Sequence, residues 1–254
     1  MRVLVCVKRV PAPGARIVLT EDARAVDARH LSFTVSPHEE CAVEEAVRIK
    51  ERQGGSVVVM TLGPAEAEEQ LRYAVSVGAD TAVLLQTDGS DWDPEATAAA
   101  IADRVSALEE RDGRFDLILF GNESADAGGY QVGIRVAHAL GRPVVSGIKG
   151  IEIDDDTAVA RREADGGVEI YRVGLPAVIS VKEGINLPRY PTLPSRLAAK
   201  KAELDVDEPS TLPGGLVMTR LVTPPEVASS TAILGNGPEA APAVVDLFEE
   251  LGLL

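Results

Sequence analysis

The chain is 254 residues long, 45 % of them hydrophobic, and carries a formal net charge of −15. This length and apolar fraction are sufficient for one large domain or for a domain with an appendage. The acidic balance disfavours nucleic acid and anionic lipid as partners, and no stretch approaches the ~18 consecutive apolar residues of a membrane span. The chain starts directly in a strand pattern, and Cys6 and Cys41 form no paired motif. We therefore expect a cytoplasmic protein without membrane insertion, secretory signal or disulfide framework.

Strands and helices alternate through the first 141 residues. Short apolar runs predict strands at 2–7, 56–63, 81–86 and 115–121. Segments of helical periodicity predict helices at 36–55, 64–78, 93–110 and 128–141. Ser36 suits the N-cap of the first helix, and Glu39 would complete a capping box with it. This alternation predicts an α/β fold with a mostly parallel, doubly wound sheet and helices on both faces.

The pattern changes in the second half of the chain. Residues 151–181 alternate apolar and polar side chains between tight turns, which predicts an antiparallel strand extension of the sheet. Residues 182–201 contain three prolines within seven positions, so they can form neither a central strand nor a long helix. We expect a protruding proline-rich arm there. The expected domains are an α/β nucleotide-binding domain over 1–206 and a C-terminal tail and helix over 207–254 that packs on a partner.

The sequence offers little for hydrolytic, metal or nucleophilic chemistry. None of the three histidines, His30, His38 and His138, has a second ligand at metal-binding spacing. No nucleophile elbow, phosphate-binding lysine motif or dinucleotide fingerprint is present in the sequence. Cys6 lies inside a strand pattern and is better explained as a buried thiol than as a nucleophile. We expect no metal site and no catalytic residue of the chain's own.

The strongest local candidate for a binding site is residues 120–136. This segment follows a predicted strand and enters a helix, which is where open α/β sheets bind ligands. Ala125, Ala127, Gly128 and Gly129 would let backbone N–H groups approach a phosphate at the helix start. Asp126 suits a helix cap or an acceptor for a sugar hydroxyl. A plain glycine turn before a capped helix explains the same residues, so both interpretations stay open.

Several segments together resemble the β subunit of electron transfer flavoproteins. They are RVLVCVKRVP, CAVEEAVRIKE, GPAEAEEQLRYAVSVGAD, READGGVEIYRVGLPAVISVKEGINLPRYPTLP and AAKK, in one order from residue 2 to about 206. The resemblance implies a heterodimer in which an α subunit holds most of the FAD. It implies that the β subunit holds AMP, or a second FAD in electron-bifurcating members, and that the proline arm docks partner dehydrogenases.

The resemblance also implies site residues. The nucleotide would contact Cys6, Ser36, Leu62, Asp126, Gly128, Gly129, Gln131, Val132 and Gly133. Ser36 stands where the family commonly has Asn, and His38 and Glu39 replace an apolar residue and a small one. The partner dehydrogenase would contact Asn186, Arg189, Tyr190, Leu193 and Pro194, with Leu193 as the anchor. Basic side chains surround that anchor at Lys182, Arg189, Arg196, Lys200 and Lys201. The alternative for this segment is a solvated helix that caps the core.

We therefore expect an electron carrier subunit and not an enzyme. Electrons would pass from flavin-dependent dehydrogenases through the shared FAD to a quinone reductase-type acceptor, because the flavin performs the redox chemistry. One alternative is the β subunit of an electron-bifurcating complex with a second FAD. Another is a nucleotide-binding regulatory protein of the universal-stress type, which has the same α/β layout and needs no flavin partner.

Overall fold

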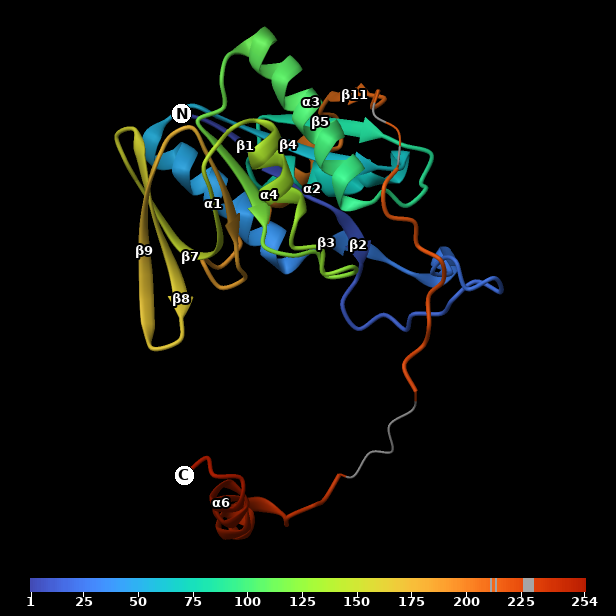
Figure 1. Ribbon diagram of the computed structural model, residues 1–254, viewed down its shortest axis with the longest axis vertical. Helices are drawn as coiled ribbons and strands as arrows, with labels where there is room; N and C mark the ends of the chain where they lie inside the picture. Colours follow the sequence, from blue (N-terminus) through green and yellow to red (C-terminus); the bar gives the residue numbers. More distant parts are fainter. Residues whose placement is uncertain (211, 213, 226–230) are drawn as a thin grey trace.

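A nine-stranded sheet crosses the body of the computed structural model, which describes residues 1–210, 212, 214–225 and 231–254 (Figure 1). Its strands are β1 (Arg2–Cys6), β4 (Ser56–Gly63), β5 (Thr81–Gln86), β6 (Leu117–Gly121), β7 (Val144–Asp154), β8 (Thr157–Ala164), β9 (Gly167–Gly174), β10 (Ala177–Val181) and β11 (Leu204–Asp207). They lie in the order β11-β5-β4-β1-β6-β10-β7-β8-β9. All neighbours from β11 to β7 are parallel, whereas β7, β8 and β9 are antiparallel.

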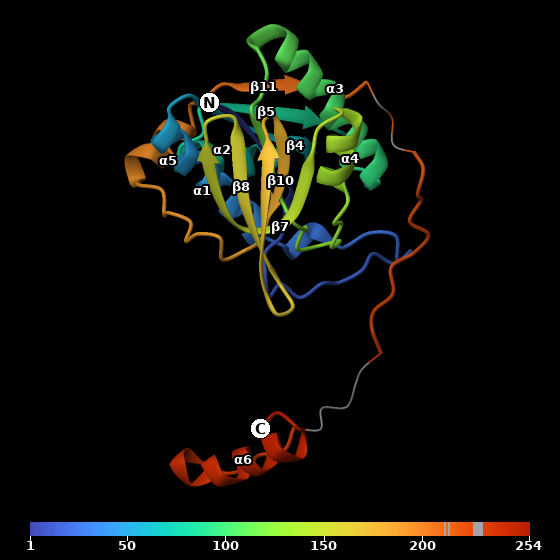
Figure 2. The ribbon, with the colours of Figure 1, turned by 60° about the vertical axis from the view of Figure 1, so that its left-hand side comes forward.

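Helices cover both faces of this sheet (Figure 2). One face packs against α1 (Pro37–Gln53) and α2 (Glu68–Val77), with the short α5 (Leu193–Ala199) beside α2. The other face packs against α3 (Pro94–Asp112) and α4 (Val132–Ala139). Successive β1 residues enter opposite cores, Val3 and Val5 on the α1 side and Leu4 and Cys6 on the α3 side. The strand order reverses between β1 and β6, which defines the switch point of a doubly wound fold.

The expected strands at 56–63 and 81–86 are confirmed to the residue, and the α/β architecture is confirmed as a whole. Two details differ. The helix expected from residue 128 begins only at Val132, because Gly128 has a φ of +59° and residues 122–131 form turns. The last strand of the expected antiparallel extension, β10, lies instead between β6 and β7 and is parallel to both. All five of its residues are buried, as a central parallel strand requires.

The peripheral segments are small. A two-stranded sheet joins β2 (Arg9–Pro11) and β3 (Phe33–Val35), and short 3₁₀ turns are η1 (Ala28–His30), η2 (Ala65–Ala67) and η3 (Gly237–Ala240). The C-terminal helix α6 (Ala241–Glu250) lies away from the sheet in both views (Figures 1 and 2). Strand β11 extends the sheet to Asp207 by pairing with β5. No helix in the described ranges is long and apolar enough to cross a membrane.

Candidate functional site

An open hollow of about 560 Å³ lies beside the switch point of the sheet. One wall is the start of α1, where Ser36, Pro37 and His38 follow the small β2–β3 sheet. The opposite wall is the loop 123–128, which follows β6, and Glu183 after β10 completes the lining. Carboxyl ends of parallel strands and a helix start therefore meet at one place, the usual geometry of a ligand crevice in this fold class.

Glu39 is a buried carboxyl group next to this hollow. Only 7 % of the residue is exposed, and its Oε2 atom accepts a hydrogen bond from the backbone N–H of Lys8 at 2.9 Å. Burial raises the pKa of Glu39 to about 8, although the backbone N–H groups of Lys8 and Ser36 oppose the shift. Gly121 makes the burial possible, since a Cβ there would lie 2.6 Å from Glu39 Cγ. Near pH 8 this carboxyl is therefore about half protonated.

Asp126 lies on the opposite wall and pairs with Lys8 at 2.6 Å between Oδ2 and Nζ. Burial is the largest single influence and pushes the pKa of Asp126 upward, but the Lys8 ammonium together with hydrogen bonds from Lys8, Ser124 and Ala127 N lowers the net pKa. The expected helix-cap role of Asp126 is wrong, because the N-cap of α4 is Gln131. The capping box is also incomplete, since the Ser36 hydroxyl makes no bond to its helix and donates to the Glu123 carbonyl at 3.3 Å.

The electrostatics of the hollow restrict what it can bind. Three carboxylates line it, from Glu123, Asp126 and Glu183. His38 Nε2 lies 3.6 Å from the Glu123 carboxylate, and His38 Nδ1 is buried with no hydrogen-bond partner among the described residues. Carboxylates accept hydrogen bonds from hydroxyl and amino groups and repel the negative charge of a phosphate.

The predicted nucleotide contacts divide into two groups. Ser36, Asp126 and Gly128 line the hollow, and Gly129 follows with nothing within 4 Å of where its Cβ would lie. The other predicted contacts are not lining residues of the hollow. They are Cys6, Leu62, Gln131, Val132 and Gly133.

Three members of the second group have structural roles. Cys6 is 5 % exposed, and burial raises the pKa of its thiol far above the ordinary value, so the expectation of an unreactive buried thiol fits. Gln131 accepts a hydrogen bond from Arg135 Nε at 3.0 Å. A Cβ on Gly133 would lie 3.0 Å from the Phe120 ring, so this glycine allows α4 to pack closely on the sheet. Lys8 was not among the site residues predicted from the sequence. Its position directly after the first predicted strand was the signal that could have identified it.

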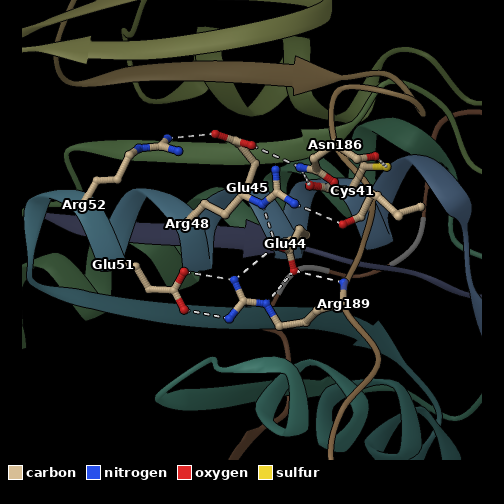
Figure 3. A network of polar contacts seen from close by, with 9 residues as sticks. Cys41, Glu44, Glu45, Arg48, Glu51, Arg52, Asn186 and Arg189 are labelled. Carbon is tan, nitrogen blue, oxygen red and sulfur yellow. Dashed lines mark hydrogen bonds and ion pairs between the residues drawn. The ribbon is translucent and has the colours of Figure 1, made fainter.

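The proline-rich segment lies along α1 and does not stand free of the body (Figure 3). Asn186 Nδ2 donates to the Cys41 carbonyl at 3.0 Å and to Glu45 Oε2 at 3.1 Å. Arg189 forms ion pairs with Glu44 at 2.8 Å and with Glu51 at 2.6 Å. The protrusion expected from the prolines is therefore not confirmed.

Apolar side chains nevertheless project from this segment to solvent. Tyr190 is 97 % exposed and Leu193 is 69 % exposed. Thr192 caps α5 by accepting a hydrogen bond from Ser195 N at 3.3 Å, and Pro194 stands in the first turn, where a missing N–H costs nothing. The segment combines a fixed backbone with an exposed apolar surface, an arrangement that suits contact with another protein.

Comparison with known proteins agrees with this geometry. Residues 25–211 match the family model described as the electron transfer flavoprotein domain. The electron transfer flavoprotein subunit beta of Bacillus subtilis is 32 % identical over 98 % of this chain and 97 % of its own length. The corresponding proteins of Syntrophomonas wolfei and Homo sapiens are 39 % and 33 % identical, over 79 % and 84 % of this chain and 77 % and 83 % of theirs.

The fold defines a doubly wound α/β protein with an open hollow beside its switch point. The chain belongs to the electron transfer flavoprotein family, and the relatives that it resembles are β subunits. The resemblance deduced from the sequence motifs is thus confirmed. Membership implies flavin-based electron transfer, and it leaves the universal-stress alternative without support.

Proposed function

We propose that this chain is the β subunit of a heterodimeric electron carrier whose α subunit holds most of the FAD. In this assignment the chain contributes a structural AMP site and a docking surface, while electrons pass from flavin-dependent dehydrogenases to a quinone reductase-type acceptor. The observation that carries the proposal is family likeness over nearly the whole chain to proteins described as subunits of electron transfer flavoproteins. The bound flavin would supply the redox chemistry, and the protein groups orient it and exclude water.

The hollow at the switch point is the proposed AMP site. Ser36 and His38 supply polar groups to its lining, and His38 Nδ1 has no hydrogen-bond partner in the described part of the chain. Asp126 offers a carboxylate for a ribose hydroxyl, although it must share that role with its ion pair to Lys8. The phosphate would then lie outward, beside Gly128 and Gly129, where no side chain intervenes.

The proposed docking surface is the proline-rich segment, residues 182–201, which includes α5. Leu193 and Tyr190 are its exposed apolar side chains, and Arg196, Lys200 and Lys201 add positive charge beside them. Burying one leucine in a partner pocket contributes roughly 2 to 3 kcal/mol. That corresponds to about thirty- to a hundredfold in affinity, which suits a carrier that must also dissociate.

The test is to purify the chain together with its α partner and to identify the nucleotides released on denaturation. One FAD and one AMP per heterodimer are expected, and the chain expressed alone should bind little FAD. Two FAD and no AMP would instead identify the electron-bifurcating alternative, in which the hollow holds the second flavin. A lone chain that is stoichiometrically yellow would overturn the assignment of FAD to the α subunit.

A further inference from the structure

Asn186 and Arg189 were both expected to contact a partner dehydrogenase. Their side chains are already hydrogen-bonded to residues of α1 (Figure 3). The Glu44 side chain is 2 % exposed and accepts hydrogen bonds from Arg189 N at 3.2 Å, from Arg189 Nε at 2.8 Å and from Arg189 Nη2 at 3.1 Å. Arg48 Nε donates to the same carboxylate at 2.6 Å. Glu51 accepts from the remaining face of the Arg189 guanidinium, so the donors of Arg189 are turned toward α1 and away from the docking surface.

The other end of the segment is held by α2. Arg72 Nη1 donates to the carbonyl oxygens of Ala199 and Lys200, both at 2.9 Å, and of Ala202 at 3.1 Å. Carbonyls at the end of a helix lack intrahelical partners, and a cation placed there both bonds them and complements the helix dipole. Arg72 therefore holds the C-terminal end of α5 against α2.

Exposed apolar side chains lie between these two attachments. Tyr190 and Leu193 are 97 % and 69 % exposed, and Leu197 on the next turn of α5 is 53 % exposed. An apolar surface of this kind would collapse onto the body or move freely unless its backbone were fixed. The segment is fixed at Arg189 on one side and at residues 199–202 on the other, and Pro191 and Pro194 stiffen the part between them.

We propose that Glu44 and Arg72 are positioning residues that hold residues 186–202 ready for docking, and that Arg189 serves this attachment and does not contact the partner. The proposal rests on the proposed docking function of the segment. A segment ordered before binding loses less conformational entropy when it docks. The planar guanidinium of Arg189 matches the Glu44 and Glu51 carboxylates with several donors at once, which a lysine ammonium cannot reproduce.

The experiment compares Glu44→Gln, Arg189→Met, Arg189→Lys and the double variant Glu44→Gln/Arg189→Met as heterodimers. Amide hydrogen exchange over residues 186–202 should speed up in the Glu44→Gln and Arg189→Met variants. With the flavin-dependent dehydrogenase that reduces the wild-type heterodimer, the KM for the carrier should rise about tenfold while kcat and flavin content stay unchanged. The double variant should be no worse than either single one, because both remove the same attachment.

Arg189→Lys separates the two roles of Arg189. If the positive charge of residue 189 contacts the partner, the lysine variant should have the wild-type KM. If the guanidinium of Arg189 is needed to hold the segment on α1, the lysine variant should show nearly the same KM and hydrogen exchange as Arg189→Met.

Arg72→Met tests the second attachment and should speed hydrogen exchange at residues 197–202. Additive KM effects in the double variant, or wild-type exchange in Glu44→Gln and Arg72→Met, would overturn the proposal.

Glu109→Gln is the matched control. Glu109 of α3 pairs at 2.5 Å with Arg142, which lies between α4 and β7, on the opposite face of the sheet. Its loss should lower the melting temperature without changing exchange in 186–202 or the KM. If no dehydrogenase reduces the wild-type heterodimer, the docking function is wrong, and the hydrogen-exchange comparison still decides whether Glu44 and Arg72 fix the segment.

Discussion

Two of the three glutamates that helix α1 buries, Glu39 and Glu44, have pKa values that shift in opposite directions. Glu39 lies beside the hollow, where burial raises its pKa to about 8. Burial also acts on Glu44, beneath the proline-rich segment, but hydrogen bonds from Arg189 and Arg48 outweigh it and lower the net pKa. Each residue is less than 10 % exposed, so burial alone does not decide the charge.

The difference lies in the groups that surround each carboxyl. Glu39 receives backbone N–H donors, while the nearby ammonium of Lys8 is paired with Asp126. Glu44 receives two guanidinium groups directly. A carboxyl that can hold a proton lies next to the hollow, and a carboxyl with a lowered pKa holds the proline-rich segment on α1. The proposed ligand site and the proposed docking surface therefore adjoin opposite electrostatic environments on a single helix.

The largest expected effect concerns the docking segment. Leu193→Ala should lower electron transfer from the dehydrogenase by one to two orders of magnitude, the scale of losing a buried leucine contact. Leu193 is 69 % exposed, so flavin content and reduction by dithionite should match wild type. A variant that loses flavin would make the segment structural, and unchanged turnover at subsaturating carrier would remove its docking role.

Substitutions at two glycines near the hollow should separate an effect on packing from an effect on ligand binding. Gly133→Val would place atoms against Phe120 and Ser180, so we expect a loss of about 1–3 kcal/mol in the free energy of unfolding. A Cβ at Gly129 would have nothing within 4 Å, so Gly129→Val should leave the melting temperature of the AMP-free heterodimer unchanged. Its AMP content after purification should nevertheless fall. Full AMP retention in Gly129→Val would exclude the loop as the phosphate position.

The pH dependence of stability tests the protonation of Glu39. Because its folded pKa of about 8 exceeds the ordinary glutamate value of 4.5, the folded state holds the proton between these two values and the unfolded state does not. Wild type should therefore lose up to about 1.4 kcal/mol per pH unit relative to Glu39→Gln as pH rises from 5 to 8. Thermal melts of both proteins at matched ionic strength measure this, and parallel pH profiles would show that Glu39 is ionised throughout.

The smallest effect on the chain's own stability should come from its C-terminal end. The helix α6 lies away from the sheet (Figure 2). Val245 and Phe248 on this helix, and Leu251 directly after it, are exposed. Deleting residues 236–254 should leave the melting temperature of the isolated chain unchanged but lower the yield of heterodimer, since this apolar surface is proposed to pack on the α subunit. Complete co-elution of the truncated chain with its partner would contradict that packing.

The sequence by itself determined the alternation of elements and the family. β4 and β5 follow from short apolar runs, and α1 and α3 follow from helical periodicity with proline in the first turn. The motif around Arg189 and Tyr190 identified the electron transfer flavoprotein likeness, which the relatives confirm. These features are local, because strand and helix periods are set by neighbouring residues.

Only the tertiary structure decided how distant segments meet. In the folded chain β10 lies between β6 and β7, and Gly121 lies against Glu39. Asn186 and Arg189 bond to residues of α1 that lie 145 positions earlier in the chain. The sequence shows that an arginine is charged, but it does not show which carboxylate pairs with it. The partner depends on the crossover connections that set the order of the strands. For the same reason the opposite pKa shifts of Glu39 and Glu44 follow from the packing of other elements onto α1 and cannot be read from the helix alone.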